Sequence, residues 1–194
     1  MASVRLRDFR PNDCDQVLAW RNSPDVAMYM YGDHDIGLAE HRIWFTALAN
    51  DNTKKYWVIE AGGVGLGVAY VFDIDRNNQR ASWGFYIGNP ELRGAGVGYF
   101  VEVFVLLYVF EHLGLNKLCC EVLADNESVW QMHEKFGFTV EGRLHAHIRK
   151  NGAYRDVIVL GMLASQWQEI KPKHLARLER RGQILPDFTV ATNA

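Results

Sequence analysis

The chain has 194 residues, of which 48% are hydrophobic and 23% are charged, and its formal net charge at pH 7 is −2. This length suits one domain with a substantial core, and the hydrophobic fraction is too high for a disordered chain. A net charge near zero excludes the broad basic field on which nucleic-acid binding depends, so no nucleic-acid partner is expected.

Cysteine usage and apolar runs restrict the class of protein further. The three cysteines include the adjacent pair Cys119 and Cys120, a spacing that suits neither a disulfide framework nor paired metal ligands, so no metal is expected. The N-terminal residues lack the apolar core of a signal peptide. The most apolar run, Tyr99–Phe110, carries Glu102 and is shorter than the roughly 20 residues of a bilayer span. It predicts a buried helix, no membrane partner and a cytoplasmic location.

Hydrophobic periodicity predicts the order β, α, α, β, β, β, α, β, α, β, β. The expected strands are Val4–Arg7, Tyr56–Glu60, Gly67–Phe72, Ala81–Ile87, Leu118–Leu123, Thr139–Arg149 and Tyr154–Leu163. The expected helices are one that follows Asn12–Asp13 and holds Val17, Leu18 and Trp20, then Leu38–Ala49, Val97–Leu113 and Glu127–Phe136. Asn151-Gly152 is typical of the turn of a hairpin between the last two strands. The pattern predicts a mixed α/β (α+β) sheet with helices on its faces.

Two segments are expected, residues 1–163 as one domain and residues 164–194 as a C-terminal extension. The extension is more basic than the rest of the chain. It is predicted to hold one amphipathic helix after Pro172, which either packs on the domain or contacts a second copy in a homodimer.

A cluster of small residues separates the fourth predicted strand from the next helix. It consists of Arg93, Gly94, Ala95, Gly96, Val97 and Gly98. Backbone amides that converge at a helix N-terminus suit a pyrophosphate, although a tight turn explains the glycines equally well. No Gly-Lys-Ser/Thr follows, and the cluster does not open a first βαβ unit, so neither a P-loop nor a dinucleotide fingerprint is present.

In this context the chain resembles the GCN5-related N-acetyltransferase (GNAT) superfamily up to about Leu163. The motifs that carry the resemblance are Arg93-x-x-Gly96-x-Gly98, Asn126 after the fifth strand, and Glu134-Lys135-Phe136-Gly137-Phe138. The resemblance implies a seven-stranded, mostly antiparallel sheet that is splayed between its fourth and fifth strands. It also implies that acetyl-CoA is the co-substrate. The pantetheine would lie along Phe85, Tyr86 and Ile87 and meet Asn126, while the amides of residues 94–98 hold the pyrophosphate.

Transfer of an acetyl group from a thioester to an amine requires a base for the amine and an acid for the thiolate. His133 lies seven residues after Asn126, two helical turns, so both face the same way. Many members of the superfamily have a tyrosine at this position; His133 is the candidate acid, or else a capping or solvent-facing histidine. Glu121 alternates with apolar residues along its strand. It is the candidate base, with its pKa raised by burial, or else the partner of an arginine on a neighbouring strand.

The N-terminal third resembles the nucleotide-sugar N-acetyltransferases of pseudaminic acid biosynthesis, which serves flagellin glycosylation. The matching runs are Trp20-Arg21-Asn22, Met30-Tyr31 and Glu40-His41 with Trp44-Phe45. The resemblance implies that the acceptor is the 4-amino group of a UDP-linked amino-dideoxy sugar. Arg21, Tyr31 and His41 could supply the cations and the aromatic surface that such a ligand needs.

Other interpretations remain open. Arg143, His145, His147 and Arg149 form either a basic stripe for the acceptor or a solvated face of the hairpin. The alternative acceptors are a ribosomal-protein N-terminus and a polyamine. Because both are cationic, an acidic cleft would favour them. An acyl-CoA-binding module without catalysis is the alternative that is not an enzyme.

Overall fold

The computed structural model describes residues 3–88 and 96–185. The strands are β1 (Val4–Asp8), β2 (Lys55–Ala61), β3 (Val64–Asp75), β4 (Arg80–Ile87), β5 (Lys117–Leu123), β6 (Thr139–Lys150) and β7 (Ala153–Leu163). The helices are α1 (Cys14–Asn22), α2 (Pro24–Ala27), α3 (Leu38–Ala47), α4 (Val97–Leu107), α5 (Glu127–Phe136) and α6 (Ala164–Glu179). A π-helical turn, Tyr108–His112, extends α4.

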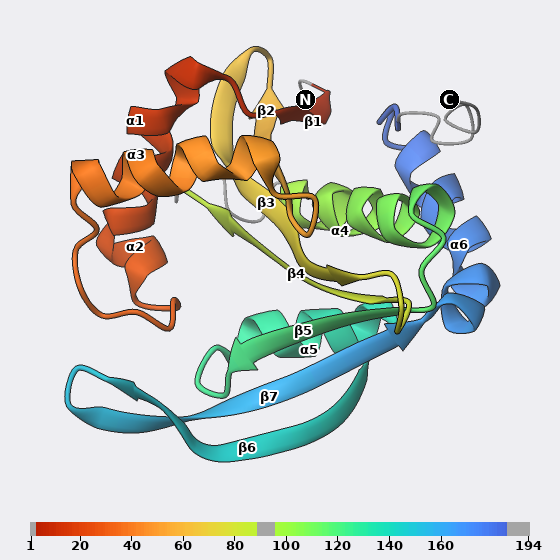
Figure 1. Ribbon diagram of the computed structural model, residues 1–194. Coiled ribbons are helices and arrows are strands. Elements are labelled where there is room, and N and C mark those ends of the chain that lie inside the picture. Colours follow the sequence, from red (N-terminus) through yellow and green to blue (C-terminus); the bar gives the residue numbers. More distant parts are fainter. Residues whose placement is uncertain (1–2, 89–95, 186–194) are drawn as a thin grey trace.

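The strands form one seven-stranded sheet in the order β1-β2-β3-β4-β5-β7-β6. All neighbours are antiparallel except β4 and β5, which are parallel. The β4–β5 ladder runs only from Arg80–Lys117 to Ser82–Cys119. Beyond it the two strands diverge, so that β1–β4 and β5–β7 form the two halves of an open V (Figure 1). The predicted fold, including the splay, is therefore confirmed.

Alternate residues of the central strands face two separate apolar clusters. Trp57 and Ile59 of β2 belong to the larger cluster, which includes most of α4. Val58, between them, belongs to a smaller cluster with Val17 and Trp20 of α1. This period of two places α4, α5 and α6 against one face and α1 and α3 against the other.

The N-terminal segment contains an element that the periodicity did not predict. Helix α2 has four residues and begins at Pro24, a position where the missing amide hydrogen costs nothing. Val26 is its one buried residue. A helix of four residues is too short to show a helical period of apolar residues in the sequence.

The predicted start of the C-terminal helix is wrong. Helix α6 begins at Ala164, directly after β7, and Pro172 lies inside it. The side chain of Gln166 accepts a hydrogen bond from the Leu163 amide at 2.7 Å, which defines the start. Trp167 is fully buried in the larger cluster. Burial of the first two turns thus outweighs the backbone hydrogen bond that Pro172 cannot donate.

Within the described ranges, no helix combines the length and the apolar character needed to cross a lipid bilayer.

Candidate active site

The strand edge predicted to meet the coenzyme is open. Phe85, Tyr86 and Ile87 pair on one side with β3. On the other side they lie past Ser82, the last residue of β4 that pairs with β5. Main-chain groups on this edge are thus available to a ligand, as in β-strand addition.

The first turn of α4 closes one end of this cleft. Gly96 has the left-handed φ of 81° that glycine adopts readily. A Cβ atom on Gly98 would lie 3.3 Å from the Phe85 ring, so α4 packs directly on the open strand. A Cβ atom on Gly96 would lie 2.7 Å from Nη1 of Arg181, which places that guanidinium at the N-terminus of α4. Arg93, Gly94 and Ala95 lie outside the described residues.

Helix α5 places Asn126 and His133 inward, as their spacing predicts. Asn126 is the N-cap residue of α5 and is 9% exposed, and His133 is 3% exposed. The histidine is thus neither a cap nor solvent-facing. Its ring packs edge-on against Trp83, with 5.2 Å between the ring centroids. Trp83 is the first residue of β4 past the β4–β5 ladder, so His133 lies where the splay opens.

The direct partner of His133 is Glu102 of α4, a residue that the sequence reasoning did not assign to the site. Oε1 of Glu102 lies 2.8 Å from Nδ1 of His133, and the glutamate is fully buried. Burial raises the pKa of the Glu102 carboxyl, and the charge and hydrogen bond of His133 oppose that rise. A lone carboxylate in the apolar run Tyr99–Phe110 was the signal that could have identified it.

On the opposite face of the sheet the structure brings Glu121 and Tyr31 together. The Tyr31 hydroxyl donates a 2.8 Å hydrogen bond to Oε2 of Glu121. Glu121 is exposed, so neither alternative predicted for it describes its surroundings: it is not buried, and the partner observed is a tyrosine. Burial raises the pKa of the Tyr31 phenol, and the hydrogen bond to Glu121 adds to the rise. Tyr31 therefore remains a proton donor at neutral pH.

Arg21 lies near the loop that carries Tyr31. A Cβ atom on Gly32, next to Tyr31, would lie 3.9 Å from Nη2 of Arg21. Burial raises the pKa of the Tyr70 and Tyr86 phenols, and the Arg21 guanidinium opposes the rise in both. We call Arg21, Tyr31, Tyr70, Tyr86 and Glu121 the acceptor cluster.

The third residue predicted to bind the acceptor, His41, does not belong to this cluster. It is 3% exposed, and its Nε2 lies 2.9 Å from the Cys14 carbonyl oxygen. Burial lowers its pKa. The ring packs beside Trp44 and Phe45 of the same helix. His41 thus joins α3 to α1 and is not available to a ligand.

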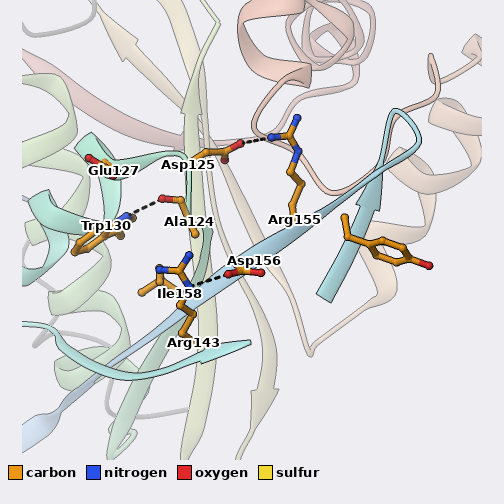
Figure 2. A pocket seen from close by; sticks show the side chains of 9 residues that line it. Ala124, Asp125, Glu127, Trp130, Arg143, Arg155, Asp156 and Ile158 are labelled. Atoms are coloured by element: carbon orange, nitrogen blue, oxygen red, sulfur yellow. Dashed lines mark hydrogen bonds and ion pairs between the residues drawn. The ribbon is translucent and has the colours of Figure 1, made fainter. Parts of the chain in front are cut away.

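A polar pocket of about 380 Å³ lies between the end of β5, α5 and the β6–β7 hairpin (Figure 2). Two ion pairs cross it, Arg155–Asp125 at 3.1 Å and Arg143–Asp156 at 2.8 Å. Asp156 also lies 3.2 Å from Nδ1 of His145. The predicted basic stripe is exposed along its length, and this carboxylate contacts the residues at its first two positions.

The loop that carries Tyr31 is fixed by the far end of the hairpin. Lys150 of β6 is 5% exposed, and its ammonium donates to the carbonyl oxygens of Ala27, at 3.0 Å, and Gly32, at 2.8 Å. The amide of Asn151 donates to Asp33 at 3.0 Å. Residues 28–37 contain no helix or strand, so these contacts hold Tyr31 over β5.

Comparison with known proteins identifies the class of enzyme. A family model for the acetyltransferase (GNAT) domain matches residues 3–139. The chain therefore belongs to the GNAT family, and it is an N-acetyltransferase with acetyl-CoA as the acetyl donor.

Two kinds of relative are about equally similar in sequence. Spermidine N(1)-acetyltransferase of Escherichia coli K12 is 27% identical over 183 residues, 94% of either chain. Acetyltransferase PseH of Campylobacter jejuni (strain 81-176) is 26% identical over 140 residues, 71% of this chain and 85% of the relative. A crystal structure of Vibrio cholerae spermidine N-acetyltransferase, in complex with CoA and spermine, superposes with a TM-score of 0.81. It is 23% identical and covers 86% of this chain and 98% of its own, which supports the fold alone.

Proposed function

We propose that this enzyme acetylates the 4-amino group of a UDP-linked amino-dideoxy sugar, as in pseudaminic acid biosynthesis. The observation that carries the proposal is the hydrogen bond between Tyr31 and Glu121, which sets a carboxylate beside aromatic surface where the sheet opens. The amine attacks the thioester carbon directly, and no covalent intermediate with the enzyme forms.

The roles of the protein groups follow from the two faces of the sheet. Bound acetyl-CoA supplies the acetyl thioester and a thiolate leaving group that requires a proton. Glu121 takes a proton from the acceptor ammonium, directly or through one water, and Tyr31 orients its carboxylate. On the other face, His133 donates a proton toward the sulfur. The open edge of β4 holds the pantetheine, with Asn126 beside it and the first turn of α4 near the phosphates.

The composition of the acceptor cluster supports a nucleotide-linked sugar. Of its three tyrosines, Tyr31 is 37% exposed, and its ring suits the flat face of a sugar or uracil ring. Its charged members are one guanidinium and one carboxylate. Arg21 suits a diphosphate, whereas Glu121 alone would leave most of the charge of a polyamine unpaired.

A polyamine is the second candidate. The pocket of Figure 2 includes three carboxylates, those of Asp125, Glu127 and Asp156, and relatives named for spermidine acetylation match nearly the whole chain. Arginines already pair with Asp125 and Asp156, which makes this pocket a weaker site for a cation than its carboxylates alone suggest.

The test is thiol release from acetyl-CoA with a panel of UDP-4-amino sugars, spermidine and N-terminal peptides. We expect turnover with a UDP-4-amino sugar, and at least a tenfold increase of its KM in Arg21→Gln, since a charged hydrogen bond contributes about 1.5–3 kcal/mol. Arg42→Gln, at an exposed arginine of α3, is the matched control. Preference for spermidine, or an unchanged KM in Arg21→Gln, would contradict the proposed acceptor.

A further inference from the structure

Three buried polar groups meet in the core beside the splay. Glu102, His133 and Trp83 are 0%, 3% and 3% exposed. Oε1 of Glu102 contacts His133, whereas Oε2 of Glu102 and Nε1 of Trp83 are the buried side-chain atoms that lack a hydrogen-bond partner among the described residues. A carboxylate in such surroundings is costly. Its retention in an otherwise apolar helix calls for an explanation.

We propose that Glu102 is a positioning residue that fixes the ring of His133 and keeps its Nε2 protonated for transfer to the coenzyme sulfur. This inference rests on the role proposed above for His133. The 2.8 Å contact occupies Nδ1, so the nitrogen left to face a ligand is Nε2. The same logic orients the histidine of a Ser-His-Asp triad through its second nitrogen.

Burial explains why the pair retains its protons. With two protons, one between Oε1 and Nδ1 and one on Nε2, the pair is neutral. If it lost the second proton in the resting enzyme, an uncompensated negative charge would remain in the core. Burial raises the pKa of Glu102, in agreement with this preference. Cys120 and Tyr99 also interact with Glu102, and burial raises the pKa of both, so both remain neutral.

The proton balance of the step is complete. The amine nitrogen forms a bond to the acetyl carbon, and the carbon–sulfur bond breaks with its electron pair on sulfur. The Nε2 proton of His133 moves to the sulfur, and the pair becomes singly negative. Glu121 releases to solvent the proton that it took from the ammonium, and it then takes the second proton that the nitrogen must lose as the amide forms, which also passes to solvent. The pair regains one proton from solvent before the next turnover, so the reaction releases one proton overall.

A double-mutant cycle on kcat tests the inference. We expect Glu102→Gln, which keeps the shape of the side chain, to lower kcat at least tenfold while the KM for acetyl-CoA stays within twofold. In a His133→Asn background the same change should have no further effect on kcat. An equal loss in both backgrounds, or an unchanged kcat in Glu102→Gln alone, would overturn it.

The design separates this inference from the proposed function. If His133→Asn retains full kcat, the role of His133 is wrong and the inference fails with it; if only Glu102→Gln retains kcat, the inference alone fails. A measurement on the unmodified enzyme covers the case in which Glu102→Gln does not fold. Histidine ¹⁵N NMR, assigned by His133→Asn, should show a protonated Nε2 at the working pH. An unprotonated Nε2 there would contradict the inference.

Discussion

A buried histidine outside the active site makes the stability of the protein depend on pH. His174 of α6 is 6% exposed. Its Nδ1 lies 2.7 Å from the Tyr99 hydroxyl, and its ring stacks on Phe136 with 4.2 Å between centroids. Burial lowers its pKa from 6.5 to about 4, and the nearby cations of Lys173 and Arg177 add to the decrease. The folded protein therefore holds this ring neutral.

The sign of the effect follows from linkage. Above pH 6.5 the ring is neutral in both states and has no influence; between pH 6.5 and 4 the unfolded chain binds a proton that the folded state does not. The free energy of unfolding should thus decrease as the pH is lowered from 6.5 to 4. Between pH 7 and pH 4.5, we expect the free energy of unfolding of His174→Phe to decrease by about 2 kcal/mol less than that of the unmodified protein. Urea unfolding at both values measures this, and equal losses would contradict it.

Some site residues were predictable from the sequence and others were not, for a physical reason. Asn126 and His133 share a helix, so their spacing fixed their common direction. Tyr31 and Glu121 are 90 positions apart, and their hydrogen bond depends on how a loop crosses the sheet. His41 occurs within a matching motif, yet it is buried against α1. Local patterns specify direction along an element and do not specify contacts between distant elements.

Among the elements, the β6–β7 hairpin acts on the acceptor side through Lys150. Its ammonium donates two hydrogen bonds to main-chain carbonyls at the ends of the segment that carries Tyr31. We expect Lys150→Met to leave two carbonyl groups without their donor and to release this loop. The KM for the acceptor should rise about thirtyfold, from roughly 1 kcal/mol for each of the two lost hydrogen bonds, while the KM for acetyl-CoA remains unchanged.

The control is Lys173→Met, at an exposed lysine of α6. A merely structural role for Lys150 would lower the melting temperature and affect both KM values alike. That outcome would exclude a specific effect on the acceptor cluster.

Element boundaries show the same limit as single residues. The helix from Val97 was predictable from its apolar sequence. Nine of the eleven residues of α4 are buried, and all of these except Glu102 are apolar. The start of α6 was not, because proline ordinarily marks the beginning of a helix. Here the packing of Trp167, a contact between segments far apart in the chain, decides the boundary.

At the scale of the whole molecule, helix α6, which follows β7, is either part of the folded core or an extension that unfolds independently of it. Helix α6 lies alongside α4 (Figure 1). Its Trp167 and Leu178 belong to the same apolar cluster as the sheet, and the indole Nε1 donates to Glu111 at 3.2 Å. A unit that supplies fully buried side chains to a core contributes to folding as that core does. We therefore expect residues 3–88 and 96–185 to unfold as one cooperative unit.

Trp167→Ala tests this expectation, because truncation of a buried tryptophan costs about 3–5 kcal/mol. Urea denaturation is followed by two signals, circular dichroism for the whole chain and acetyl-CoA binding for the cleft. We expect the two transitions to coincide in the unmodified protein and to shift together to a lower urea concentration in the variant. Glu169→Ala, on the exposed side of the same helix, should leave both unchanged. If Trp167→Ala instead leaves the cleft transition in place while part of the helical signal is lost separately, then α6 is an independent extension and the 1–163 domain folds without it.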